Sequence, residues 1–281
     1  MTWSSSDLAQ HCLSDRARTD ALCEAIRNMD LNHQHVLDIG SGTGVLALAA
    51  LDAGASSVHL VELDTVAAAF LRSRARREGD RMVVIEADAR SLQLDRIPDA
   101  ILVELLDVWF LEEDFYPTLR FGAEQGWITE STKVLPSGYT WTFEVGRLTG
   151  ESFRFGIEFP YYEWPQYVRH PDMWQLPTFE PTQTFDLGTQ TAYEIATGPS
   201  DRQHSLTCDH APEERLAFRL SGKLHLGATT AAGFPSLNSP VVIPAIAPHP
   251  NPEIPLELSY ELGGGVASIR ISAGGESLLP W

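Results

Sequence analysis

The sequence predicts an α/β protein in two parts, a Rossmann-like parallel-sheet domain over residues 1–135 and an antiparallel, β-barrel-like domain over residues 136–281. Strand-like and helix-like segments alternate from Val36 to about Trp127, which is typical of a parallel sheet with crossover helices. Beyond residue 130 polar and apolar residues alternate with a period of two, as in half-buried antiparallel strands, and no helix is expected. The strands expected there are Tyr139–Val145, Arg215–Leu226, Leu256–Leu262 and Val266–Ser272. The pattern changes at Val134-Leu135-Pro136-Ser137-Gly138.

A glycine-rich loop follows the first predicted strand. One helix is expected over about Ala17–Met29, and the strand Val36–Ile39 then leads into Gly40-Ser41-Gly42-Thr43-Gly44 and the apolar helix Val45–Leu51. Glycine lets the backbone turn tightly and approach a ligand with no Cβ in the way. The helix behind the loop directs free N–H groups and the positive end of its dipole at that ligand. We therefore predict a nucleotide-like cofactor site at Gly40, Ser41, Gly42 and Gly44.

Acidic residues lie near the ends of the first three predicted strands. Asp38 stands two positions before the glycine run, Glu62 ends the second strand, and Asp88 with Ala89 follows the third. An acid about 20 residues beyond such a loop can bind both ribose hydroxyls, which suits Glu62, with Asp64 as the alternative. A lone acid after a strand is more often a helix cap or a solvated turn. Three acidic residues at the ends of successive strands favour a shared ligand. The later strands are expected at Val58–Glu62, Met82–Ile85 and Ala100–Glu104.

The glycine spacing distinguishes cofactor classes. A dinucleotide fingerprint is G-x-G-x-x-G and a P-loop contains G-K-[ST], whereas here the third glycine comes one residue early and no G-K-[ST] is present. With Asp38, the run resembles motif I of class I S-adenosylmethionine (SAM) methyltransferases, in which the loop packs against the amino-acid end of SAM. In that pattern Asp88 and the backbone N–H of Ala89 contact the adenine edge. An NAD(P)-type site is the alternative.

Composition limits the partners and the compartment. The net charge of −18 argues against nucleic acid, and it is compatible either with a cationic substrate or with simple solubility. No run of 18 apolar residues predicts a membrane span, and no signal peptide is recognised. Cys12, Cys23 and Cys208 lack C-x-x-C spacing, which favours buried thiols in a reducing cytoplasm over disulfides or zinc.

Two glutamates flank the loop after the fourth predicted strand. Glu104 ends the strand and Glu113 comes nine positions later, so acids on two arms of one loop can converge. The carboxyl end of this strand faces the reactive end of a ligand bound over the first strand. Converging carboxylates suit a metal ion, a general acid/base pair or a guanidinium, whose planar fork each carboxylate can bind bidentately. A metal site would need further ligands, and we predict none.

On these residues the chain resembles the protein arginine N-methyltransferase (PRMT) family, in which a SAM-binding Rossmann-like domain precedes a β-barrel and a "double-E" loop follows the fourth strand. The resemblance implies that Glu104 and Glu113 are the catalytic glutamates of that loop. Within Asp15-Arg16-Ala17-Arg18-Thr19 it places Arg18 where an arginine grips the SAM carboxylate. Val134-Leu135-Pro136 resembles the family's crossing into the barrel.

The second half departs from the family pattern. Members carry a Thr-His-Trp loop whose histidine pairs with an aspartate on the N-terminal helix. Asp15 matches that aspartate, but the nearest register to the loop reads Ser236-Leu237-Asn238. The N-terminal helix looks short, and no helical dimerisation arm is evident, so the oligomeric state is left open, a dimer being the family form. The aromatic segment Phe159–Trp174 would be a contact surface or interdomain packing.

The residues therefore predict a SAM-dependent N-methyltransferase that acts on a guanidino group, in an arginyl peptide or in a free arginine-like metabolite. Two alternatives stay open at this point. One is a methyltransferase of another small-molecule nucleophile, and the other is a non-catalytic SAM-binding partner subunit.

Overall fold

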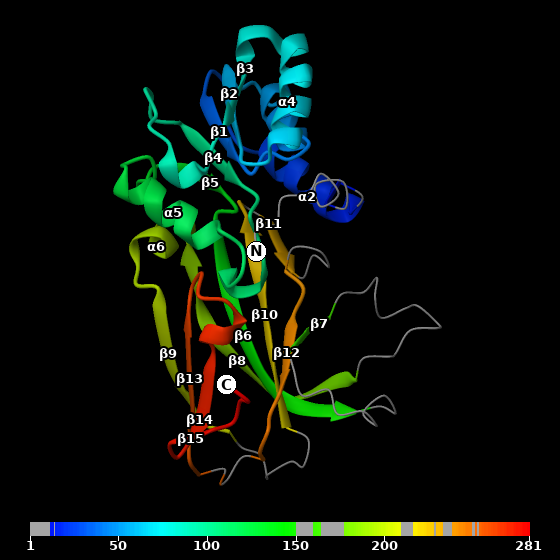
Figure 1. Cartoon of the computed structure of the whole chain (residues 1–281), viewed down its shortest axis with the longest axis vertical. Coiled ribbons are helices and arrows are strands. Elements are labelled where there is room, and N and C mark those ends of the chain that lie inside the picture. Colours follow the sequence, from blue (N-terminus) through cyan, green and yellow to red (C-terminus); the bar gives the residue numbers. More distant parts are fainter. Residues whose placement is uncertain are drawn as a thin grey trace.

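A computed structural model describes residues 12–13, 15–149, 160–163, 177–208, 216–227, 229–232, 238–248, 251 and 253–281. A parallel sheet with its helices occupies one end of the molecule, and long antiparallel strands run away from it toward the other end (Figure 1). Within these ranges no helix is long and apolar enough to cross a membrane.

The parallel sheet has the strand order β3-β2-β1-β4-β5. Its strands are β1 (His35–Ile39), β2 (Ser57–Glu62), β3 (Met82–Glu86), β4 (Ala100–Val103) and β5 (Lys133–Leu135). The helices around it are α2 (Arg16–Arg27), α3 (Val45–Asp52), α4 (Thr65–Glu78) and α5 (Phe115–Glu124), with short 3-10 turns at η1 (Gly79–Arg81), η2 (Ala89–Ser91) and η3 (Val108–Phe110). Strand order reverses between β1 and β4, which opens a ligand crevice at the carboxyl ends of these two strands.

The turn between β1 and α3 depends on its glycines. Gly40, Gly42 and Gly44 have φ values of 74°, 50° and 74°, in the left-handed region that residues with a Cβ rarely adopt. A Cβ on Gly40 would lie 2.7 Å from a methyl carbon of Leu105. The loop therefore packs directly against the segment that leaves β4, and this contact brings the two predicted sites together.

The second half consists of two antiparallel sheets. The larger has the order β7-β12-β10-β6-β8, with β11 paired to β10, and the smaller has the order β15-β14-β13-β9. The larger sheet contains β6 (Gly138–Thr149), β7 (Tyr161–Tyr162), β8 (Thr178–Thr191), β10 (Leu216–Leu226), β11 (Thr229–Ala232) and β12 (Val241–Pro244). The smaller contains β9 (Asp201–Leu206), β13 (Leu256–Glu261), β14 (Arg270–Ala273) and β15 (Glu276–Ser277). The predicted α/β class is confirmed, but the described strands form two sheets rather than a closed barrel.

Two expectations for the second half were wrong. A short helix, α6 (Ala192–Thr197), begins at a capping box in which Thr191 accepts from the backbone of Glu194 and the Glu194 side chain accepts in return. The T-x-x-E signal was present in the sequence, and the helix forms because α5 covers it. The segment expected as a strand over Val266–Ser272 starts instead as the 3-10 turn η5 (Val266–Ser268) and becomes extended only in β14.

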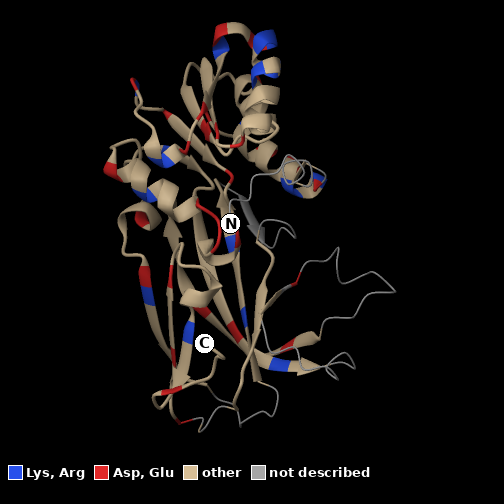
Figure 2. Ribbon diagram, in the orientation of Figure 1, with Lys and Arg blue, Asp and Glu red and all other residues tan. Residues whose placement is uncertain are grey.

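The two halves meet at the loop between β4 and α5. Figure 2 shows acidic residues on the loops where the parallel sheet meets the antiparallel strands. The arginines of α4 lie at the end of the parallel half that is farthest from the antiparallel strands. The division of the chain at residues 135 and 136 stays a prediction, although β5 ends at Leu135 and β6 begins at Gly138. Of the aromatic segment Phe159–Trp174, all but residues 160–163 lie outside the described residues.

Candidate active site

Asp38 is buried beneath the glycine loop with no partner for its carboxylate. The residue is 1% exposed, and neither carboxylate oxygen has a hydrogen-bond partner among the described residues. The hydroxyl of Ser41 donates to the backbone oxygen of Asp38 (2.8 Å) instead. Burial raises the pKa of Asp38 to about 7, the nearby hydroxyl of Ser41 and the backbone N–H of Ala47 oppose this rise, and the carboxylates of Glu104 and Glu62 add to it. A buried carboxylate in this state is stabilised when a ligand supplies a donor, preferably a cationic one.

Glu62 is held against the same loop. One carboxylate oxygen accepts from the backbone N–H of Gly42 and the other from that of Asp64, both at 2.8 Å. Each oxygen keeps a lone pair for a ligand hydroxyl. The alternative residue, Asp64, caps α4 by accepting from the backbone N–H of Ala67 (2.8 Å). Both acids keep acceptor capacity for a ribose, but only Glu62 is bonded to the glycine loop itself, and its role stays a prediction.

Asp88 has an intramolecular partner that the sequence reading missed. The guanidinium of Arg90 donates to it at 3.0 and 2.8 Å, and the backbone N–H of Arg90 donates at 2.9 Å. These bonds lower the pKa of Asp88. Arg90 also contacts Asp114 (3.1 Å), while Ala89 is buried beside it. Contact of Asp88 and Ala89 with an adenine edge stays a prediction, and it would share the Asp88 carboxylate with Arg90.

Arg18 and Glu104 form an ion pair. Their side chains are 3% and 19% exposed, so the pair is largely shielded from water. Burial by itself would lower the pKa of Arg18, but the Glu104 carboxylate raises it. Burial raises the pKa of Glu104 and the Arg18 guanidinium opposes that rise. The Nε of Arg18 has no hydrogen-bond partner in the described part of the chain. Two residues predicted to bind two different ligands therefore contact each other.

Glu113 lies close enough to Glu104 for their charges to interact. Burial raises the pKa of Glu113 to about 7, and the charge of Glu104 contributes to the rise. Burial raises the pKa of the Cys12 thiol, and the charges of Glu104, Arg18 and Glu113 also act on it. The loop thus brings the two glutamates close enough for their charges to interact, and their convergence on one ligand stays a prediction. Cys12, which the sequence suggested only as a buried thiol, is a neighbour of this site. Among the described residues no His, Cys, Asp and Glu gather in a group that could hold a metal ion.

Asp107 and Trp109 shape the loop between the two glutamates, and the sequence reading overlooked both. Asp107 accepts three backbone N–H groups from residues 111–113, and burial raises its pKa to about 7. The buried indole of Trp109 donates from Nε1 to the backbone oxygen of Ser221 in β10 (2.7 Å). An acid three positions after Glu104 was the available signal for Asp107. Nothing local pointed to the partner of Trp109.

Asn238, at the position nearest in register to the Thr-His-Trp loop, makes structural hydrogen bonds. Its side-chain oxygen accepts from the hydroxyl of Tyr139 (2.6 Å), and its amide donates to the backbone oxygen of Gly222 (2.7 Å). The Tyr139 oxygen in turn accepts from the backbone N–H of Trp109 (3.3 Å). Asn238 therefore supports the glutamate loop through a chain of hydrogen bonds from the antiparallel half.

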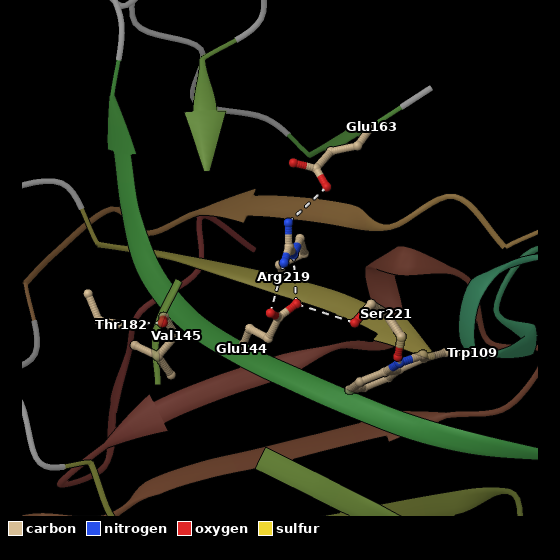
Figure 3. Close-up of polar contacts among 7 residues, drawn as sticks. All are labelled: Trp109, Glu144, Val145, Glu163, Thr182, Arg219 and Ser221. Atoms are coloured by element: carbon tan, nitrogen blue, oxygen red, sulfur yellow. Dashed lines mark hydrogen bonds and ion pairs between the residues drawn. The ribbon is translucent and has the colours of Figure 1, made fainter. Parts of the chain in front are cut away.

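A cluster of ion pairs lies next to the contact between Trp109 and Ser221 (Figure 3). Arg219 binds Glu144 through two bonds of 2.6 and 2.8 Å and reaches Glu163 at 3.3 Å. The Ser221 hydroxyl donates to Glu144 (3.3 Å), while the Ser221 backbone oxygen accepts from Trp109. Arg219 and Glu144 neutralise each other and join β10 to β6 beside Ser221, the residue that Trp109 contacts.

Comparison with known proteins shows which proteins this chain is similar to. Residues 16–130 match the family model of ribosomal protein L11 methyltransferase (PrmA). An uncharacterized protein of Methanocaldococcus jannaschii is 22% identical over 263 residues, which cover 93% of this chain and 95% of the relative. A probable protein arginine N-methyltransferase 6.1 of Oryza sativa subsp. indica is 28% identical over 154 residues, which cover 52% of this chain and 39% of the rice protein. The chain thus spans about two fifths of that relative's length.

Solved structures share the fold over nearly the whole chain. A structure of PRMT6 superposes with a TM-score of 0.63 at 15% identity, covering 96% of this chain and 99% of that one. The Trypanosoma brucei PRMT1 enzyme–prozyme heterotetrameric complex with AdoHcy gives a TM-score of 0.61 at 17% identity, covering 98% and 96%. These matches support a PRMT-like SAM-dependent methyltransferase: residues 16–130 match a methyltransferase family model, and the PRMT structures share the fold.

The residues of this methyltransferase fit SAM. The buried carboxylate of Asp38 has the charge to bind the SAM ammonium group, and the buried, cationic Arg18 has the charge to bind the SAM carboxylate; both roles stay predictions. Glu62 offers acceptors to the ribose hydroxyls. Gly40 lets the loop pack closely against Leu105, since a Cβ there would collide with that side chain.

Proposed function

We propose that this methyltransferase transfers the methyl group of SAM to a guanidino nitrogen, in an arginyl peptide or in a free arginine-like metabolite. One observation carries the proposal: Glu104 already pairs with a guanidinium, that of Arg18, and Glu113 lies beside it. A second carboxylate next to a guanidinium-binding carboxylate fits the flat, multiply donating guanidino group better than the point charge of an amine. The similarity to a probable protein arginine N-methyltransferase supports the same substrate class.

On the cofactor side, the roles follow from charge and reach. Arg18 would hold the SAM carboxylate, Asp38 its ammonium group and Glu62 its ribose, with Asp88 and Ala89 at the adenine edge. When bound, SAM supplies an electrophilic methyl group on a sulfonium centre. Arg18 has a further task, because it occupies Glu104 until the cofactor carboxylate offers it another anion. Glu104 is then released to bind the substrate.

On the substrate side, Glu104 and Glu113 would neutralise the guanidinium and aim one nitrogen. Carboxylates on the other nitrogens hold the positive charge there and leave the aimed nitrogen more nucleophilic. Holding that nitrogen in a near-attack position can account for roughly 7–11 kcal/mol of the barrier. The pKa of Glu113, about 7, also lets its carboxylate take up the proton that the methylated nitrogen loses.

The test compares three classes of acceptor with radiolabelled SAM: free L-arginine, an arginine-rich peptide and a cell metabolite extract, with a lysine-rich peptide alongside. We expect label in at least one guanidino acceptor and none in the lysine peptide. Glu104→Gln should abolish turnover while S-adenosylhomocysteine still binds, because it leaves one carboxylate to hold a desolvated cation. The exposed-helix variant Glu124→Gln is the matched control.

Three results would contradict the proposal. Label confined to non-guanidino compounds would point to another nucleophile. Cofactor binding without transfer to any acceptor would point to a non-catalytic subunit. Near-normal turnover in Glu104→Gln would reject the paired-carboxylate site itself.

A further inference from the structure

Asp107 lies between the two glutamates, three positions after Glu104 and six before Glu113. Its side chain turns back into its own loop. One carboxylate oxygen accepts from the backbone N–H groups of Leu111 (3.1 Å) and Glu112 (2.9 Å), and the other accepts from the backbone N–H of Glu113 (3.3 Å). Three consecutive N–H groups of the arm that carries Glu113 therefore converge on a carboxylate of the arm that carries Glu104.

The middle of the loop has an unfavourable backbone conformation that its surroundings must hold. Trp109 and Phe110 have φ values of 61° and 57°, in the left-handed region, although both carry a bulky side chain. Such residues persist only where neighbouring contacts fix them. Trp109 is fixed by its bond to Ser221, and Phe110 stacks on Phe115 at 4.3 Å between ring centres. These contacts hold the middle of the loop but not the arm beyond it.

The arm beyond Phe110 has two further anchors in the antiparallel half. The backbone oxygen of Leu111 accepts from Gly265 (2.8 Å), and the side chain of Glu112 accepts from the backbone N–H of Val266 (2.7 Å). Both anchors act before the chain reaches Glu113. The backbone N–H of Glu113 itself donates to Asp107, and this bond ties the second glutamate to the arm that bears the first.

We propose that Asp107 is a positioning residue, which holds the backbone of Glu113 so that its carboxylate meets the same guanidinium as Glu104. The proposal rests on the guanidino methyl transfer proposed above. Asp107 need not touch the substrate, because its two oxygens are engaged by the loop and it acts through Glu113. A catalytic loop built this way keeps its two carboxylates at a set separation even when no ligand is bound.

Two variants and a control separate this role from general stability. Asp107→Asn keeps the size of the side chain and one acceptor oxygen, but it turns an NH₂ group toward one set of N–H donors. Asp107→Ala removes all three hydrogen bonds. Asp95→Asn changes an exposed aspartate outside the loop and is the matched control.

The first measurement needs no turnover. Hydrogen exchange of peptides spanning residues 104–115 reports whether the N–H groups of residues 111–113 stay bonded. We expect exchange there to quicken by about tenfold or more in Asp107→Ala and by less in Asp107→Asn, with the control unchanged. Equal protection in wild type and Asp107→Ala would overturn the proposal.

The second measurement is steady-state methyl transfer with the best guanidino acceptor. We expect kcat/KM to fall about ten- to a hundredfold in Asp107→Ala and less in Asp107→Asn, while the Kd of S-adenosylhomocysteine changes by less than about twofold. Unchanged kcat/KM, or equal loss of cofactor binding and turnover, would overturn the positioning role. If the wild type methylates no guanidino compound, the proposed function fails, whereas the exchange comparison still decides whether Asp107 holds the arm of Glu113.

Discussion

The carboxylate of Asp38 links cofactor binding to pH in a way that can be measured. It is buried with neither oxygen in a hydrogen bond to the part of the chain that the structure describes, and burial raises its pKa to about 7 from an ordinary value of 3.8. An ammonium group bound beside it favours the ionised carboxylate. Binding of the cofactor should therefore expel a proton from Asp38 wherever the free protein is protonated.

The size of the effect follows from the pKa. A group with a pKa of about 7 is about 90% protonated at pH 6 and about 10% at pH 8, so binding should release about 0.9 proton at pH 6 and about 0.1 at pH 8. The association constant should rise about tenfold over the same interval. Because the folded pKa of Asp38 lies above the unfolded one, ionisation lowers the free energy of unfolding of the ligand-free protein as pH rises from about 4 to about 7, by up to about 4 kcal/mol.

Titration calorimetry with S-adenosylhomocysteine, which retains the amino-acid end of SAM, measures the protons directly when repeated in buffers of different ionisation enthalpy at pH 6, 7 and 8. Asp38→Asn should lose the proton release and should be more stable than the wild type at pH 8 without ligand, whereas Asp95→Asn should change neither. Release of fewer than about 0.2 proton by the wild type at pH 6, or equal release by Asp38→Asn, would refute the reasoning.

Three further predictions follow from the site and its supports. Glu113 binds a guanidinium only when ionised, so kcat/KM of the wild type should rise between pH 6 and 8 with an apparent pKa of about 7, and the pH profile of Glu113→Gln should lose that step. Gly40→Ala forces a Cβ against Leu105 at a φ of 74° and should cost about 1–3 kcal/mol, seen as a lower Tm and weaker S-adenosylhomocysteine binding; an unchanged Tm would contradict the crowding. Arg219→Met leaves Glu144 buried and unpaired and should cost about 3–5 kcal/mol in urea unfolding, whereas a loss below about 1 kcal/mol would show that the cluster supports nothing.

Short-range patterns were read correctly from the sequence. The glycine run, the strands of the parallel sheet and the long strands β6 and β10 depend on backbone preference and on the alternation of buried residues, and both are local. The helix α6 was missed although its capping box, Thr191 to Glu194, was readable. A six-residue helix has little stability of its own, so its formation depends on packing against α5.

The pairing of charges was beyond reach of the sequence. Arg18 and Glu104 were each assigned to a ligand, and only the folded chain shows that they bind each other. The partner of Trp109, Ser221, lies 112 positions away on a strand of the other half. The hydrogen bonds of Asp107 are local in sequence, but they exist only because two residues between it and Glu113 adopt left-handed backbone angles.

The sequence by itself determined the fold class and the cofactor, because glycine spacing and strand-end acids are properties of short segments, whereas the role of the two glutamates stays a prediction. The tertiary structure decided how those glutamates are held. The residues of the loop between β4 and α5 do not by themselves fix its conformation. Its shape comes from Leu105 packed on Gly40, from the bond of Trp109 to the antiparallel half, and from Asp107, whose carboxylate joins the two arms.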